Sequence, residues 1–240
     1  TEPDGFNINE GVGSTSPAAL QEKVLSEQAD AGIAFDGDGD RVQCVAADGS
    51  VVDGDELLFI IAMDRVRRGG IVEGVVGTQM TNLGMEQGLA EHGISLVRAS
   101  VGDRHVLTAM SKKGWLLGGE ASGHIICGDL ATTGDGIIAA LQVLAAMIGS
   151  GESLLSLKSG MRKLPQTMIN VPIAAGFELT QCAPALAESE RVEALLADRG
   201  RLVLRPSGTE PLIRVMIEGR DAAENLQLAE GLAEVIRQSV

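Results

Sequence analysis

Short apolar segments alternate with longer segments of helical spacing between residues 71 and 148, and this alternation constrains the fold most strongly. Apolar runs typical of strands cover 71–76, 95–99 and 115–117, and helical patterns cover 82–92, 106–113 and 136–148. Strands that are separated by helices usually pair in parallel, with the helices on the faces of the sheet. The sequence therefore predicts an α/β fold of three layers with a mostly parallel mixed sheet.

The flanking regions follow other patterns. Before residue 71, we expect a helix over 16–28 with Ser16 as its N-cap, strands over 31–35, 42–47 and 51–52, and a helix over 53–65. After residue 148, we expect helices over 154–164, 189–198 and 221–238, and strands over 168–173, 201–204 and 212–218. Because the strict alternation ends near Pro165, the last region is expected to be a smaller α+β domain. This change of pattern predicts a domain boundary between residues 164 and 165.

Three aspartates, Asp36, Asp38 and Asp40, follow the apolar run 31–35 and are separated by single glycines. The glycines let the backbone bend, so the three carboxylates can converge. Clustered carboxylates repel one another unless a cation neutralises them, and hard oxygen ligands select Mg²⁺, Ca²⁺ or Mn²⁺. An EF-hand is excluded, because the sixth position is Arg41 and the twelfth is Ala47, where glycine and glutamate are needed. A metal site with a phosphate beside it, which Arg41 favours, and a solvated acidic turn remain open.

A second polar loop, 118–124, follows the expected strand at 115–117 and is too rich in glycine to continue it. It carries a carboxylate, a hydroxyl and an imidazole on Glu120, Ser122 and His124. These groups suit the vicinal hydroxyls of a sugar, because each hydroxyl both donates and accepts hydrogen bonds. The alternative is a turn with an incidental histidine. The later segment 132–135 is expected to be the N-cap of the helix that follows it.

A third loop, from Arg205 to Arg214, lies between two expected strands. Its residues Ser207, Gly208 and Thr209 can present backbone N–H groups and two hydroxyls as an anion site. The two arginines can each bind a phosphate through paired N–H groups. The loop is therefore a candidate phosphate clamp. Arg104, in the loop 101–106, is either a further phosphate ligand or an exposed residue on a solvated turn.

Composition narrows the partners of this 240-residue chain. Its net charge of −14 disfavours nucleic acid and anionic membranes, and its 2% of aromatic residues predict an aliphatic core without stacking platforms for single strands. The longest apolar run, 136–149, is too short to span a membrane and is expected to be a core helix. The isolated cysteines are expected to be buried thiols: Cys44, Cys127 and Cys182. We expect a cytoplasmic protein.

Taken together and in this order, the three loops resemble those of the α-D-phosphohexomutase superfamily. The segments 36–41, 119–124 and 205–211 are similar to its metal, sugar-recognition and phosphate-binding loops. The stretches 101–104, 132–137 and 211–216 are most similar to the bacterial phosphoglucosamine mutase branch. Pro206 departs from that branch, where lysine is usual, so one cationic contact to phosphate is lost. Ala121 stands at a variable place and does not fix the substrate.

The resemblance implies the end of the second domain (1–45) and all of the third (46–164) and fourth (165–240) domains of a four-domain enzyme. Such an enzyme interconverts glucosamine 6-phosphate and glucosamine 1-phosphate through a phosphoserine and a 1,6-bisphosphate. It implies one Mg²⁺ on the three aspartates, Arg41 assisting phosphoryl transfer, and glucosamine 1,6-bisphosphate or glucose 1,6-bisphosphate as activator. The family's Thr-Ala-Ser-His-Asn-Pro serine motif has no match here, so we expect the chain alone to be inactive. A homodimer is compatible with the resemblance.

Three alternatives remain open. A phosphomannomutase or phosphoglucomutase of the same superfamily would share all three loops. A non-catalytic fragment would bind a phosphosugar without the nucleophile. A haloacid-dehalogenase-type phosphatase would use Asp36 as a covalent nucleophile, because an Asp-x-Asp pair follows an apolar strand. That last class leaves the segments 120–124 and 205–214 without a role.

Overall fold

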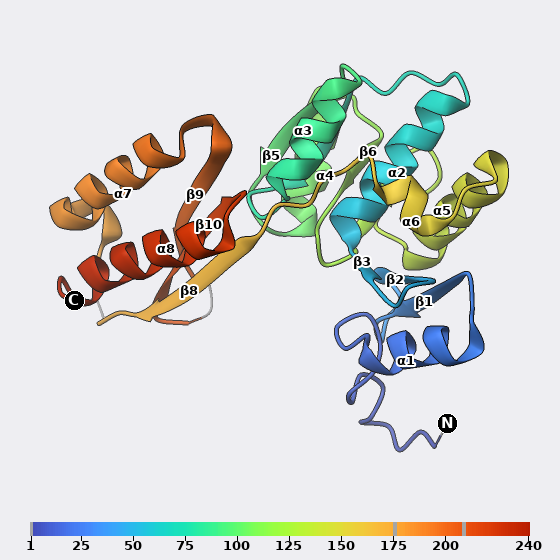
Figure 1. Ribbon diagram of the computed structural model, residues 1–240, viewed down its shortest axis with the longest axis horizontal. Coiled ribbons are helices and arrows are strands. Elements are labelled where there is room, and N and C mark those ends of the chain that lie inside the picture. Colours follow the sequence, from blue (N-terminus) through green and yellow to red (C-terminus); the bar gives the residue numbers. More distant parts are fainter. Residues whose placement is uncertain (1, 175–176, 208–209) are drawn as a thin grey trace. The chain divides into compact units, whose positions relative to one another are not determined.

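The computed structural model describes residues 2–174, 177–207 and 210–240 (Figure 1). The chain divides between Arg162 and Lys163 into two compact units, unit 1 before this point and unit 2 after it. Each unit has an apolar core of its own. No helix in the described ranges is both long and apolar enough to cross a membrane.

Unit 1 begins with helix α1 (Ala18–Glu27) and an antiparallel sheet of β1 (Ala31–Phe35), β2 (Val42–Ala46) and β3 (Val51–Val52), in that order. Phe35 pairs with Val42, so residues 36–41 form the turn between two neighbouring strands. The expected N-cap at Ser16 is wrong. Pro17 occupies that position, and no side chain caps the helix, because proline has no side-chain oxygen to accept from the N–H groups of the first turn.

The second sheet of unit 1 has the order β5-β4-β6-β7. Its strands are β4 (Gly74–Thr78), β5 (Ser95–Ala99), β6 (Leu117–Gly119) and β7 (Ile125–Cys127). Strand β4 pairs in parallel with β5 and β6, while β7 is antiparallel to β6. The helices of this part are α2 (Gly54–Arg67), α3 (Leu83–Glu91), α4 (Asp103–Lys113), α5 (Gly136–Ser150) and α6 (Leu154–Lys158). The prediction of a mostly parallel mixed sheet is confirmed.

Three local features differ from what the sequence predicted. Strand β6 runs into Gly118 and Gly119, although so much glycine was expected to end it. The glycine at 118 lets α4 pack closely, because a Cβ there would lie 2.6 Å from the sulfur of Met110 and 2.9 Å from Cγ1 of Val106, both on α4. Strand β7 was not expected at all. Helix α4 begins at Asp103 instead of Val106, so most of the expected loop 101–106 is its first turn.

Helix α2 forms the centre of the aliphatic core. Leu57, Leu58, Ile60 and Ile61 are at most 1% exposed. The helix is fixed at its start by Asp53, whose carboxylate accepts hydrogen bonds from two N–H groups of the first turn. Helix α5, expected to be a core helix, buries only one side. Its opposite side exposes three large apolar residues: Ile137, Leu141 and Ile148.

Unit 2 is an antiparallel sheet with the order β8-β10-β9 and helices over one face (Figure 1). The strands are β8 (Gln166–Pro172), β9 (Gly200–Pro206) and β10 (Leu212–Gly219). The helices are α7 (Ala183–Leu196) and α8 (Ala222–Arg237), with short 3-10 helices η1 (Leu179–Gln181) and η2 (Ala197–Arg199). The α+β architecture is confirmed. Helix α7 starts six residues before the expected Ser189, because proline is compatible with its first turn.

The two faces of the unit 2 sheet differ. Ile213, Val215 and Ile217 of β10 are buried in the core that α7 and α8 complete. Side chains alternate between the faces along a strand, so Arg214 of β10 points to the face without helices. This face carries the candidate phosphate residues.

Candidate functional site

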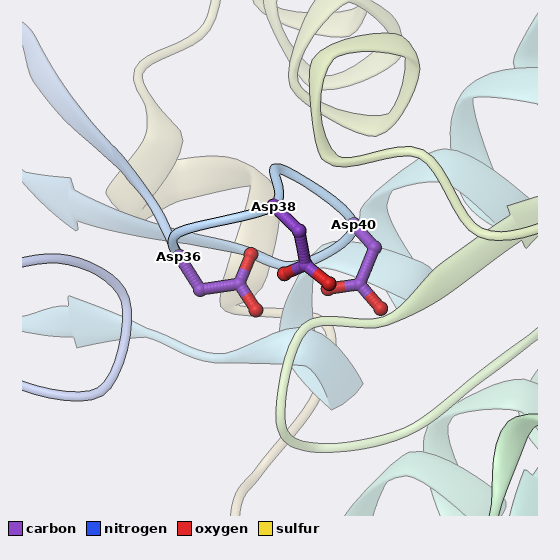
Figure 2. Close-up of side chains that lie close together, drawn as sticks. All are labelled: Asp36, Asp38 and Asp40. Atoms are coloured by element: carbon purple, nitrogen blue, oxygen red, sulfur yellow. The ribbon is translucent and has the colours of Figure 1, made fainter. Parts of the chain in front are cut away.

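Asp36, Asp38 and Asp40 converge within the turn between β1 and β2 (Figure 2). One carboxylate oxygen from each residue lies within 4.8 Å of the other two. Oxygen ligands of one hard cation sit about 2.0–2.6 Å from it, so a single ion can reach all three carboxylates. In the described part of the chain, no other group of three histidine, cysteine or acidic side chains is close enough to share a metal ion.

The electrostatics of the turn favour a bound cation. Burial alone would raise the pKa of Asp36, but the Arg41 N–H, the Asp40 carboxyl and the Arg41 charge lower it overall. Burial and the neighbouring Asp36 carboxyl raise the pKa of Asp40, against the effect of His124. Two like charges in one site move the two pKa values apart in this way. Oδ1 of Asp40 is also buried and accepts no hydrogen bond within the described residues. A cation would satisfy that oxygen and remove the repulsion.

Arg41 borders the aspartates directly. Its backbone N–H donates to Oδ1 of Asp36 at 3.1 Å. Its Nε atom lies 3.7 Å from Oδ2 of Asp36 and 3.9 Å from Oδ1 of Asp40. The side chain is 45% exposed, so the guanidinium can face both the carboxylates and an anion in solution. This position suits contact with a phosphate beside the metal.

Glu120 and Ser122 lie in the tight turn that joins β6 to β7. Oε1 of Glu120 accepts a 2.7 Å hydrogen bond from the N–H of Gly102, which immediately precedes α4. The Ser122 hydroxyl lies 3.4 Å from Oε2 of the same carboxylate and is exposed. One oxygen of the Glu120 carboxylate is therefore held in place, while the neighbouring Ser122 hydroxyl remains accessible to a ligand. A sugar-binding role for the pair stays a prediction.

His124, unlike Ser122 of the same turn, is buried. The residue is 5% exposed, and its Nδ1 is 3.0 Å from Oδ2 of Asp40. Its backbone pairs with Arg41 in an isolated antiparallel bridge. The structure thus brings His124 to the metal loop, through a contact between residues 84 positions apart in the sequence. The expected sugar contact of His124 also stays a prediction.

Backbone hydrogen bonds tie the metal loop to the segments around it. The N–H of Val42 donates to the carbonyl of Gly123 at 3.1 Å, and the N–H of Gly136 donates to that of Gly39 at 3.0 Å. Glycine is required at these contacts. A Cβ on Gly123 would lie 2.0 Å from the Val42 oxygen, and one on Gly136 would lie 2.8 Å from the Gly39 oxygen. The backbone approaches so closely that no side chain fits.

The segment 132–137 has a second role that sequence reasoning missed. Asp135 does cap α5, accepting a 2.9 Å hydrogen bond from the N–H of Ile138, as expected. The glycines on either side of it brace the metal loop, Gly134 against the His124 ring and Gly136 against the Gly39 carbonyl. The sequence signal for this second role is the pair of glycines that flank Asp135. An N-cap needs only the aspartate, so the glycines indicate close contacts with other segments.

Arg104 lies on the first turn of α4 and is exposed. Its N–H donates to the Asp103 carboxylate at 2.6 Å, and its carbonyl accepts from the Thr108 hydroxyl at 2.7 Å. The hydrogen bond between Gly102 and Glu120 brings this turn to the sugar-recognition loop. A phosphate contact for Arg104 is not tested by this geometry.

In unit 2, Arg205 of β9 and Arg214 of β10 face each other directly across the sheet. Their Nε atoms are buried and donate to no partner within the described residues. Burial, followed by the charge of Arg214, lowers the pKa of Arg205. Arg214 reaches Glu210 at 3.4 Å. Like charges placed directly opposite destabilise a sheet, and an anion would relieve this repulsion.

The rest of the candidate phosphate loop is described in part. The N–H of Ser207 donates to the carbonyl of Leu212 at 2.9 Å and closes the turn between β9 and β10. Gly208 and Thr209 lie outside the described residues. Sequence reasoning missed Asn170 of β8, which pairs with Arg214 in the register. The period of two along residues 166–172 could have placed Asn170 on the polar face, but not opposite Arg214.

Two family models match the chain. One describes the alpha/beta/alpha domain III of phosphoglucomutase/phosphomannomutase and matches residues 53–164; the other describes the C-terminal domain and matches 168–235. The chain belongs to the phosphoglucomutase/phosphomannomutase family. This membership confirms the family resemblance, and the matched residues include the loops 119–124 and 205–211. It also decides against a haloacid-dehalogenase-type phosphatase.

Relatives within the family are similar along nearly all of the chain. It is 53% identical over 239 residues to a phosphoglucosamine mutase of Thioalkalivibrio sulfidiphilus, covering 98% of this chain and 53% of that protein. It is 55% identical over 238 residues to a phosphoglucosamine mutase of Pseudomonas fluorescens, covering 99% of this chain and 53% of the relative. The chain therefore spans about half the length of the curated relatives it matches.

Solved structures show the same fold. An N-acetylphosphoglucosamine mutase of Aspergillus fumigatus, in complex with GlcNAc-6P and magnesium, superposes with a TM-score of 0.78 at 21% identity, over 95% of this chain and 57% of that one. A phosphoglucomutase/phosphomannomutase family protein from Burkholderia thailandensis gives 0.73 at 18% identity, over 94% and 50%. The fungal enzyme in complex with glucose 1,6-bisphosphate gives 0.73 at 20% identity, over 96% and 53%.

Proposed function

We propose that this chain carries the metal, sugar and phosphate loops of a phosphoglucosamine mutase, which interconverts glucosamine 6-phosphate and glucosamine 1-phosphate. The observation that carries this proposal is the 53–55% identity to proteins of that name over at least 98% of the chain. The matched region includes all three loops. A phosphoglucomutase or phosphomannomutase is the alternative that the shared fold leaves open.

The three aspartates hold the cation in this proposal. Two observations support Mg²⁺ at Asp36, Asp38 and Asp40. The fungal mutase was solved in complex with magnesium, and Oδ1 of Asp40 is buried without a hydrogen bond within the described residues. When bound, Mg²⁺ supplies positive charge that stabilises a transferring phosphoryl group. Arg41 binds the same group from the side, because its half-exposed guanidinium already borders the carboxylates.

Glu120 and Ser122 bind the sugar hydroxyls. The N–H of Gly102 occupies one oxygen of Glu120, so the carboxylate has a fixed direction and can accept from a hydroxyl with its other lone pairs. The Ser122 hydroxyl both donates and accepts. It can therefore bind the sugar hydroxyls in both orientations of a bisphosphate intermediate that reorients during the reaction. Glucosamine 1,6-bisphosphate or glucose 1,6-bisphosphate would be the activator, in line with the complex of the fungal enzyme.

Arg205 and Arg214 bind a phosphate on the open face of the unit 2 sheet. Two guanidiniums in register offer paired N–H donors to one dianion, and Ser207 and Asn170 extend the polar surface. Gly208, Thr209 and Arg104 are proposed as further phosphate contacts from the sequence. Cytoplasmic location and a homodimer likewise remain proposals.

The test is a chimeric enzyme. The portion of the Pseudomonas fluorescens relative that precedes the matched residues is fused to this chain, and kcat/KM is measured on three hexose 6-phosphates. We expect glucosamine 6-phosphate to exceed glucose 6-phosphate and mannose 6-phosphate by at least about tenfold, which corresponds to about 1.4 kcal/mol of transition-state binding. A preference for glucose or mannose would overturn the proposal.

A control uses the chain alone. It has no serine in the family's His-Asn context, so it should show no turnover of glucosamine 6-phosphate above background. Turnover by the chain alone would mean that it holds a nucleophile of its own outside that context.

A further inference from the structure

His124 is a buried polar side chain whose position the sugar-recognition loop does not explain. The residue is 5% exposed, whereas Ser122 of the same turn is exposed. Its Nε2 atom is buried and has no hydrogen-bond partner within the described residues. Buried polar atoms usually have a hydrogen-bond partner. The hydrogen bond that stabilises this buried ring must therefore be made by the other ring nitrogen, Nδ1.

The ring is held in one orientation. The His124 carbonyl accepts from the N–H of Glu120 at 3.0 Å, and the His124 backbone pairs with Arg41. Gly134 packs against the ring so closely that a Cβ there would lie 2.2–2.5 Å from three of its atoms. These contacts leave Nδ1 directed at Oδ2 of Asp40, at 3.0 Å.

The two oxygens of Asp40 therefore differ. Oδ2 faces the histidine, while Oδ1 is buried without a hydrogen bond within the described residues. A carboxylate has only acceptors, so the nitrogen that faces it must carry the proton. With Oδ2 engaged, the side chain cannot rotate freely, and Oδ1 is left on the side of Arg41, whose Nε lies 3.9 Å from it and 3.7 Å from Oδ2 of Asp36.

We propose that His124 is a positioning residue of the metal loop: its Nδ1–H holds Oδ2 of Asp40 and leaves Oδ1 to the cation. This inference rests on the proposed metal site at Asp36, Asp38 and Asp40. It assigns His124 to the support of the ion instead of to the sugar. Groups that hydrogen-bond a metal ligand typically change metal affinity by about 10–100-fold when they are removed.

Two substitutions separate this hydrogen bond from simple packing. The amide nitrogen of an asparagine reaches the place of Nδ1, whereas that of a glutamine reaches the place of Nε2. Asparagine is the smaller side chain and fills the pocket less well. A packing role therefore predicts that His124→Gln is better tolerated than His124→Asn, and the positioning role predicts the reverse order of cation affinity.

The experiment is titration calorimetry of Mg²⁺ into the full chain. We expect the dissociation constant of His124→Asn to lie within about threefold of wild type and that of His124→Gln to be about 10–100-fold weaker. Thermal unfolding of both variants confirms that they fold. Equal affinities in the two variants would overturn the inference alone. A wild-type chain that binds no cation would overturn the proposed metal site and, with it, this inference.

A spectroscopic measurement on the metal-free wild-type chain needs no variant. Nitrogen-15 NMR of the histidine rings distinguishes a protonated from an unprotonated ring nitrogen. We expect the proton of neutral His124 on Nδ1, facing Asp40, and an unprotonated Nε2. A proton on Nε2 alone would overturn the inference, whether or not the variants fold.

Discussion

Replacing Arg205 by methionine should make unit 2 insensitive to phosphate without weakening it. Methionine keeps most of the apolar stem of the arginine, so the packing on β9 is largely retained. The substitution removes one of two guanidiniums that face each other across β9 and β10. It also removes a buried Nε that has no acceptor within the described residues.

The expected magnitude follows from these contacts. Like charges directly opposite in a sheet cost roughly 0.2–1 kcal/mol, so in phosphate-free buffer the variant should equal or exceed wild type by up to about 1 kcal/mol. Phosphate at about ten times its dissociation constant stabilises wild type by about 1.4 kcal/mol, because only the folded state binds it. The variant should gain none of this. The order of stability should therefore reverse as phosphate is added.

Hydrogen exchange of the peptide that covers β10, followed by mass spectrometry in the full chain, reports on unit 2 separately from unit 1. Phosphate is titrated against chloride at constant ionic strength. Arg220→Met is the matched control, since it removes the same charge from an exposed position of unit 2 outside the arginine pair. Protection of Arg205→Met by phosphate to the wild-type extent would refute the assignment. A loss of more than about 1 kcal/mol without phosphate would refute the argument from repulsion.

Three further predictions concern unit 1. Asp38→Asn should weaken Mg²⁺ binding at least about tenfold in calorimetry, while Asp48→Asn on an exposed hairpin turn should not; equal affinities would contradict the metal site. Gly134→Ala should lower the free energy of unfolding by about 1–3 kcal/mol in a denaturant titration, because its Cβ would overlap the His124 ring. Gly231→Ala, whose Cβ would meet the Glu188 carboxylate at an ordinary 3.9 Å, should be neutral or stabilising. Burial raises the pKa of the Cys44 thiol from 9.0 to about 12, so native Cys44 should not react with a thiol reagent at pH 8. Its contribution to stability should be complete below pH 9 and be lost between pH 9 and 12, and rapid labelling of the folded chain would show the thiol to be accessible.

Local sequence patterns predicted the parts of the site that depend on neighbouring residues. The three aspartates are spaced within one turn, so glycine spacing alone was enough to bring their oxygens together. The alternation of strands and helices likewise predicted the parallel part of the sheet. In both cases the information lies within one segment and its immediate neighbours.

Contacts between distant segments could not be predicted in this way. His124 reaches Asp40 only because β7 pairs with β6 and carries the histidine to the start of β2, and β7 has just three residues. Asn170 lies opposite Arg214 because of the strand register, which depends on the whole sheet. The exposed side of α5 shows the same limit, since an apolar helix does not specify how many of its faces are covered.

The metal loop is held in place by bonds between backbone atoms, through Gly39, Val42 and Gly123, none of which a ligand supplies. The conformational entropy of this turn is therefore lost when the chain folds. Ion binding does not have to order the turn and carries no further entropy cost for it. The site is preorganised. Ion binding should consequently exchange hydration water for carboxylate oxygens with little rearrangement of the chain. Substitutions among the aspartates could then change which cation is preferred while the backbone around them stays where it is.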